Sequence, residues 1–105
     1  MILSDAEWDQ RVQNGAEWFN DTKPSWLSLV DTDTLDMGSN CMLDQVFAEE
    51  ARLNDQPNGF LWATREYRTD PAFDVSELGF GTGTGLRQAW LRLIRRLREE
   101  AGYKG

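Results

Sequence analysis

The chain has 105 residues, with 18 Asp or Glu against 11 Lys or Arg and a formal net charge of −7. This length fits one domain, residues 1–105, and the 40% of apolar residues can supply its core. The absence of histidine and the single cysteine, Cys41, exclude Ser-His-Asp and Cys-His catalysis, a zinc ligand set and an intramolecular disulfide. We therefore expect a protein that is not an enzyme and that has neither a cofactor nor a metal.

The sequence also predicts where the protein works. No apolar run approaches the roughly 20 residues that span a bilayer, and the first residues lack the basic and apolar regions of a signal peptide. With only one cysteine, nothing indicates an oxidising compartment. We expect a cytoplasmic protein that makes no membrane contact.

The charge is divided unevenly along the chain. Residues 1–80 hold 16 acidic and five basic residues, a net charge of −11, whereas residues 81–105 hold six basic and two acidic residues, a net charge of +4. An acidic body repels nucleic acid, so nucleic acid is not the expected partner. The basic C-terminal region is the exception that needs an explanation.

A helix is predicted to begin near Asp5, because Ser4 and Glu7 have the spacing of a capping box. Gly15 interrupts this segment at a cost of about 1 kcal/mol relative to Ala, which leaves two shorter helices as an alternative. The apolar residues fall on one helical face as far as about Asn20. They are Trp8, Val12, Ala16 and Phe19.

The middle of the chain predicts a second helix after a stretch of turns. Residues 26–30 alternate imperfectly and suggest a short extended piece, and the Asp and Thr side chains of residues 31–36 are typical of turns. Ser39 or Asn40 is the expected cap of a helix that ends by Asn54. One stripe of that helix carries Leu43, Val46, Phe47 and Ala51.

The next segments are short. Residues 56–59 form a turn signal, and residues 60–62 favour a short helix over an extended piece. Asp70 followed by Pro71 is typical of a helix cap with proline in the first turn, so a brief helix is expected to stop at Gly79.

The last predicted helix follows a flexible glycine loop, residues 81–85, is capped by Thr84 and runs to about Ala101. Its apolar stripe consists of Leu86, Ala89, Trp90, Leu93, Ile94 and Leu97. Its remaining face carries Arg87, Arg92, Arg95, Arg96 and Arg98. Like charges three and four residues apart destabilise a helix, so we expect acidic groups beside this face.

The elements together predict a mainly α fold, a bundle of four to five helices with long ordered loops and at most a minor β pairing.

One motif suggests a cofactor. Residues Glu77–Gly83 have an acid-x-Gly-x-Gly-x-Gly spacing that looks like the first motif of S-adenosylmethionine-dependent methyltransferases, and residues 73–76 are a candidate for the strand before it. Only 22 residues follow Gly83, too few for the parallel sheet that forms such a crevice. A loop between two helices is the preferred interpretation.

Two other candidate sites have simpler explanations. A calcium loop counted from Asp31 would need Gly at the place of Asp36 and an acid at the place of Met42, so Asp31, Asp33 and Asp36 are expected in caps and turns. Cys41 falls in the first turn of the second predicted helix, where the helix dipole favours a thiolate. Without a histidine to act as base, we expect a small, partly buried side chain.

The arginines of the last helix have three interpretations. They pair with the protein's own acids, they dock an acidic protein, or they bind nucleic acid, which the acidic body disfavours. Five Trp exceed what a core of this size needs, and Trp is enriched in binding hot spots. The predicted partner-binding residues are Arg87, Arg92, Arg95, Arg96, Arg98, Trp26 and Trp62.

Several segments between residues 17 and 98 together resemble a group of small uncharacterised proteins of actinobacteria and, above all, of their bacteriophages. The segments are Pro24-Ser25-Trp26, Val30 to Met37 with its Leu35-Asp36-Met37, Cys41-x-Leu43-x-Gln45-x-Phe47, Gly79-Phe80, and Ala89-Trp90-x-x-x-Ile94 with the arginines around it. The chain departs from the group after Phe47, where it has Ala48-Glu49-Glu50 instead of glycine and aromatic residues. The resemblance implies a phage context and no mechanism.

We therefore expect a non-enzymatic protein–protein interaction module, encoded by a phage and acting on a host protein. One alternative is an acidic DNA mimic that inhibits a DNA-binding protein, with Asp31, Asp33, Asp36 and Asp44 among the carboxylates that imitate phosphates. A second alternative is an S-adenosylmethionine-binding fragment at Glu77–Gly83.

Overall fold

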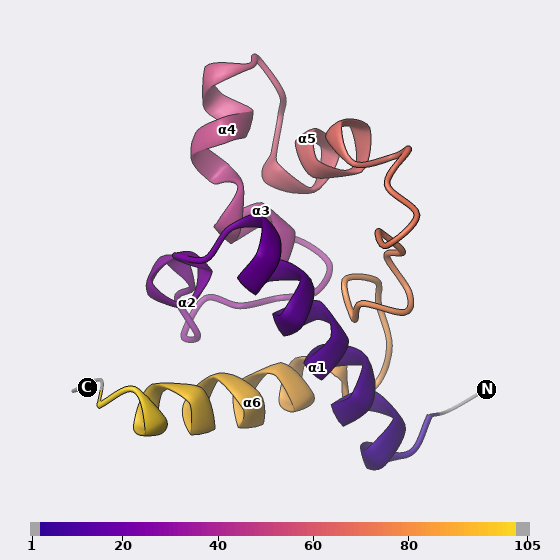
Figure 1. Ribbon diagram of the computed structural model, residues 1–105, viewed down its shortest axis with the longest axis vertical. Helices are drawn as coiled ribbons and strands as arrows, with labels where there is room; N and C mark the ends of the chain where they lie inside the picture. The colour runs from indigo at the N-terminus through magenta and orange to yellow at the C-terminus, as the bar shows by residue number, and fades with distance from the viewer. Residues whose placement is uncertain (1–2, 103–105) are drawn as a thin grey trace.

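Six α-helices and their connecting loops make up the computed structural model, which describes residues 3–102 (Figure 1). The helices are α1 (Asp5–Thr22), α2 (Trp26–Leu29), α3 (Met42–Val46), α4 (Ala48–Leu53), α5 (Gly59–Glu66) and α6 (Leu86–Glu100). Within the described residues, the one extended pairing is an isolated bridge between Asp36 and Asn40. The predicted mainly α fold is confirmed, with six helices in place of four to five.

The two long helices, α1 and α6, pack against each other, and α1 crosses α6 in the lower half of Figure 1. The short helices α3, α4 and α5 pack among themselves, and α4 and α5 lie at the opposite end of the molecule from α6. The radius of gyration, 13.1 Å, matches that of one compact domain of about 100 residues.

Helix α1 begins where the capping box predicts. The Ser4 hydroxyl oxygen accepts a hydrogen bond from the Glu7 amide at 3.2 Å, and the Glu7 carboxylate accepts one from the Ser4 amide at 3.2 Å. The helix continues through Gly15 to Thr22, so the alternative of two shorter helices is wrong. Its buried face carries Trp8, Val12, Gly15, Ala16, Trp18 and Phe19.

Gly15 is the point at which α1 approaches its neighbours most closely. A β-carbon at this position would lie 2.1 Å from the Leu78 carbonyl oxygen and 3.0 Å from the Trp90 ring. Glycine therefore costs some helix propensity here but permits a contact that no other residue allows.

Helix α6 buries the predicted stripe. Leu86, Ala89, Trp90, Leu93 and Ile94 are buried and Leu97 is half-buried. The helix ends at Glu100, close to the predicted end. Its N-cap is Gly85, in the left-handed conformation with φ of +94°, and not Thr84, because the chain turns into the helix at Gly85 without a side-chain cap.

Residues 26–30 do not form the predicted extended piece, because Trp26–Leu29 is a single helical turn, α2. The Trp26 amide bonds the Lys23 carbonyl at 2.9 Å, which starts this turn directly after α1. The turn directs the Trp26 side chain into the core and leaves Leu29 exposed. Burial of one large ring decides the conformation of this segment, and alternation of polarity does not.

The second predicted helix is divided into α3 and α4 at Phe47, whose ring is buried. Its N-cap is Cys41, with the Asp44 carboxylate accepting from the Cys41 amide at 3.3 Å. Ser39 and Asn40 are not the cap, because both amides bond the Asp36 carbonyl in a tight turn. The predicted stripe Leu43, Val46, Phe47 and Ala51 is buried.

The short helix predicted over residues 60–62 is present as α5, capped by the Asn58 side chain. The brief helix predicted from Asp70 to Gly79 is absent, and this stretch consists of turns. The Asp70 carboxylate accepts from the Ala72 amide at 2.9 Å, and Asp74 starts a separate turn four residues later. Each aspartate therefore caps only one turn. The second turn ends at Gly79, which adopts φ of +71°.

Aromatic rings form the centre of the core. Trp18 of α1 has five ring neighbours with centroids 5.0 to 6.1 Å away: Phe19, Phe47, Tyr67, Phe73 and Phe80. Phe80 stacks on Trp90 of α6 at 6.0 Å with an interplanar angle of 5°. The cluster therefore connects both long helices with the segment between α5 and α6.

Gly15→Ala tests the close contact between α1 and its neighbours. We expect it to lower the free energy of unfolding by about 2 kcal/mol or more, although alanine is the better helix former, because the new methyl overlaps the Leu78 carbonyl. Urea unfolding followed by circular dichroism measures the change.

Gly81→Ala is the matched control, since its methyl would meet only Val75, at 3.7 Å. It should change the stability by less than about 0.5 kcal/mol. Equal effects of the two substitutions would show that α1 is not held this closely.

Candidate functional site

The five arginines of α6 divide into two groups. Arg87 and Arg98 are half-buried and bond backbone carbonyls of α2 and of the loop that follows it. The Arg87 Nε donates to the Leu35 carbonyl at 2.6 Å, and the Arg98 Nη2 donates to the carbonyls of Leu27 at 3.0 Å and Val30 at 2.5 Å. These two side chains connect α6 to α2 and to the loop after it, a role that the sequence alone did not reveal.

The remaining three, Arg92, Arg95 and Arg96, are exposed and form what we call the arginine surface. Arg92 pairs with Asp9 of α1 at 2.7 Å, and Arg95 pairs within the helix with Glu99 at 3.7 Å. Asp9, on the neighbouring helix α1, is an acidic group beside this face, as expected, whereas Glu99 belongs to α6 itself.

Arg96 has a weaker partner, because its Nη2 donates to the amide oxygen of Gln13 at 3.3 Å. Within the described residues no carboxylate lies within 4.0 Å of its guanidinium nitrogens. Among residues 3–102, one positive charge of the arginine surface therefore has no carboxylate to balance it.

A groove of about 560 Å³ runs beside the arginine surface, between α1 and α6. We call it the α1/α6 groove. Val12 and Leu93, both buried, contribute apolar atoms to its floor, and its remaining lining residues are Ala6, Asp9, Gln10, Gln13, Arg92 and Arg96.

The two tryptophans predicted to contact a partner lie elsewhere. Trp26 is only 2% exposed, stacks on Phe19 and donates its Nε1 to Asn20 at 2.9 Å. It is a core residue with no surface to present, so the prediction of a contact role for Trp26 is wrong. Trp62 is half-buried on α5, against Phe47, and the structure does not bring it to the arginine surface.

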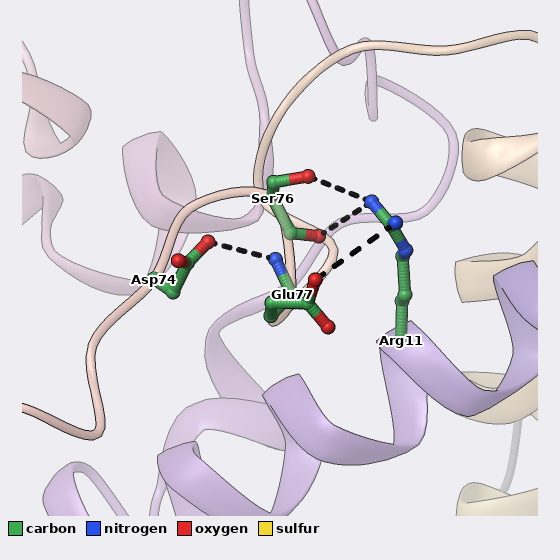
Figure 2. A network of polar contacts seen from close by, with 4 residues as sticks. All are labelled: Arg11, Asp74, Ser76 and Glu77. Atoms are coloured by element: carbon green, nitrogen blue, oxygen red, sulfur yellow. Dashed lines mark hydrogen bonds and ion pairs between the residues drawn. The ribbon is translucent and has the colours of Figure 1, made fainter. Parts of the chain in front are cut away.

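The glycine motif is part of a braced loop (Figure 2). Arg11 of α1 donates to the Ser76 hydroxyl at 2.7 Å and to the Ser76 carbonyl at 3.2 Å, and it approaches Glu77 at 4.0 Å. The Asp74 carboxylate accepts from the Glu77 amide at 3.0 Å. The candidate strand over residues 73–76 is thus a turn, and Glu77 faces an arginine of the same chain.

The glycines that follow pack against Trp8. A β-carbon at Gly83 would lie 2.4 Å from the Trp8 ring, and one at Gly85 would lie 3.3 Å from it. A hollow of about 620 Å³ lies beside this loop, lined by Trp8, Phe73, Val75 and Leu86 among others. Its one basic lining group, Arg11, is already bonded to Ser76, so the hollow offers little for an anionic ligand.

Two of the three aspartates of the candidate calcium loop cap turns with their carboxylates. Asp31 accepts from the Asp33 amide at 3.0 Å, and Asp36 accepts from the Gly38 amide at 2.8 Å. Over residues 3–102, no three Cys, Asp or Glu side chains come together in a way that could hold a metal ion.

None of the six helices is both long enough and apolar enough to cross a membrane.

Comparisons with protein-family models, with curated proteins and with solved structures gave no match for this chain.

Arg98→Met tests the division of the arginines into two groups. We expect a loss of about 1–2 kcal/mol in the free energy of unfolding, because methionine keeps the apolar packing but leaves the Leu27 and Val30 carbonyls without their donor. Arg95→Met, at a side chain that is 84% exposed, should change it by less than about 0.5 kcal/mol. The reverse order, in a thermal or urea melt, would contradict the assignment.

The reactivity of Cys41 tests its burial. The residue is 3% exposed, and burial raises the pKa of its thiol to about 11. Relative to an ordinary pKa of 9.0, this lowers the thiolate fraction at pH 8 by about 100-fold. Alkylation by iodoacetamide, followed by mass spectrometry, should therefore be at least that much slower in the folded protein than in urea. Similar rates in both would contradict a buried thiol.

Proposed function

We propose that the protein is a non-enzymatic interaction module that docks an acidic protein on the arginine surface, Arg92, Arg95 and Arg96. The observation that carries this proposal is the imbalance of charge on α6. Among the residues that the structure describes, the three exposed arginines have two carboxylate partners, Asp9 and Glu99, on a chain whose net charge is −7.

Electrostatic complementarity favours a protein partner over nucleic acid. The body up to residue 80 carries a net charge of −11, which repels a long polyanion, and Asp9 places a carboxylate directly within the surface. A folded protein with a local acidic patch can satisfy the arginines and keep its other charges away from this body. Arginine also suits such an interface, because its planar fork can bind a carboxylate through two hydrogen bonds.

We further propose that the protein is phage-encoded and that its partner is a host protein of actinobacteria. This part of the proposal rests on the resemblance of residues 17–98 to small proteins of actinobacteria and their phages. A host protein that fits the proposal presents an acidic surface, and its binding to this protein requires Arg92, Arg95 and Arg96.

Selection from a random dodecapeptide library on the immobilised protein tests the docking function, because such a library samples acidic and non-acidic ligands alike. We expect the selected peptides to be acidic, and the triple variant R92Q/R95Q/R96Q to bind them about 10- to 100-fold more weakly, since each exposed ion pair contributes up to about 1 kcal/mol. Fluorescence anisotropy with labelled peptides measures the affinities.

The triple variant R52Q/R65Q/R68Q is the matched control, because it removes the same charge from exposed arginines outside α6. It should keep the affinity within about two-fold. Peptides that are not acidic, or that bind both triple variants equally, would overturn the proposal.

A labelled DNA duplex that binds at 150 mM salt through the three α6 arginines would overturn it in favour of nucleic acid. Capture of a DNA-binding protein that does not need these arginines would instead support DNA mimicry by the acidic body.

A further inference from the structure

The α1/α6 groove has two polar rungs above an apolar floor. Arg92 and Arg96 stand four residues apart on α6, and Asp9 and Gln13 stand four residues apart on α1, so each pair forms successive positions on one helix face. The Arg92 Nη2 reaches Asp9 at 2.7 Å, and the Arg96 Nη2 reaches Gln13 at 3.3 Å.

The two rungs differ in charge. The first joins a guanidinium to a carboxylate and is neutral, whereas the second joins a guanidinium to an amide and keeps a positive charge. Arg96 has five N–H donors, and only one of them has a partner among the described residues. The second rung therefore has both the charge and the free donors to bind one additional carboxylate.

The floor adds a second requirement. Leu93 and Val12 are 6% and 1% exposed and line the groove between the rungs, so a ligand that fills it must bring apolar atoms as well as an acid. A phosphate backbone lacks such apolar groups, and the Asp9 carboxylate repels it.

We infer that the α1/α6 groove receives a short protein segment in which an acidic side chain is followed closely by an apolar one. The carboxylate binds the guanidinium of Arg96 in place of the Gln13 amide, and the apolar side chain lies against Val12 and Leu93. This inference rests on the proposed docking of an acidic protein, and it assigns that docking to one groove and one class of sequence.

Gln13→Glu tests the inference by supplying the missing carboxylate from the chain itself. The new glutamate should pair with Arg96 and compete with the ligand, so the affinity for the selected acidic peptides should fall at least five-fold. Circular dichroism and the urea midpoint should remain as in the unmodified protein, because an exposed ion pair changes stability little.

Gln56→Glu is the matched control. Gln56 also accepts a hydrogen bond from an arginine, Arg65, at 3.4 Å, but it belongs to the loop between α4 and α5. These two helices lie at the opposite end of the molecule from α6. The substitution adds the same charge beside an equivalent contact. It should leave the peptide affinity within two-fold.

A double-mutant cycle identifies the group that meets Arg96. In the unmodified protein, changing the peptide's acidic residue to its amide should weaken binding several-fold, and in the Gln13→Glu protein the same change should have almost no effect. Changing the peptide's apolar residue to serine should weaken binding to both proteins.

The outcomes separate the two proposals. If Gln13→Glu and Gln56→Glu weaken binding equally, or if the cycle shows no coupling, the groove is not the site, while docking on the arginine surface survives. If the selected peptides carry acids without a neighbouring apolar residue, the assigned sequence class is wrong. If R92Q/R95Q/R96Q binds normally, the docking function fails first, and the inference fails with it.

Discussion

The close contact between α1 and α6 at Gly15 is the constraint on which the rest of the structure depends. Because Gly15 has no side chain, the Leu78 carbonyl and the Trp90 ring can lie directly against α1. Trp90 then stacks on Phe80 and donates its Nε1 to the Gly79 carbonyl at 2.7 Å, which fixes the loop before α6. The α1/α6 groove lies between the same two packed helices, and two of its lining residues, Val12 and Leu93, belong to the core.

The arginines of α6 serve two purposes because they point to two environments. Arg87 and Arg98 turn toward α2 and the loop that follows it, where they donate to the carbonyls of Leu27, Val30 and Leu35. Arg92, Arg95 and Arg96 remain exposed, and only the first meets an acid of another helix. A basic helix on an acidic protein is therefore partly a structural device, and the surface that remains for a partner is smaller than the charge pattern suggests.

The sequence predicts those elements whose signals are local. The capping box at Ser4 and the apolar periodicity of residues 86–97 locate α1 and α6, since both depend on neighbours within a few residues. The errors at residues 26–30 and 70–79 arise where a distant contact or a second turn decides the conformation, because an aspartate that caps one turn looks the same as one that caps a helix. The partners of Arg87 and Arg98 lie 52 to 71 residues away in the sequence, and no local pattern indicates them. The imbalance at Arg96 likewise becomes visible only when α1 is placed beside α6.

The most direct measurement of the central claim is an NMR titration of the ¹⁵N-labelled protein with a selected acidic peptide. The largest chemical-shift changes of amide and guanidinium signals should fall on residues of the α1/α6 groove. The Arg96 Nε–H signal should move most, and the side-chain amide signal of Gln13 should change because Gln13 loses its hydrogen bond from Arg96. Shifts that gather instead on the loop of residues 73–85, or on α4 and α5, would contradict the assignment of the docking site to the arginines of α6.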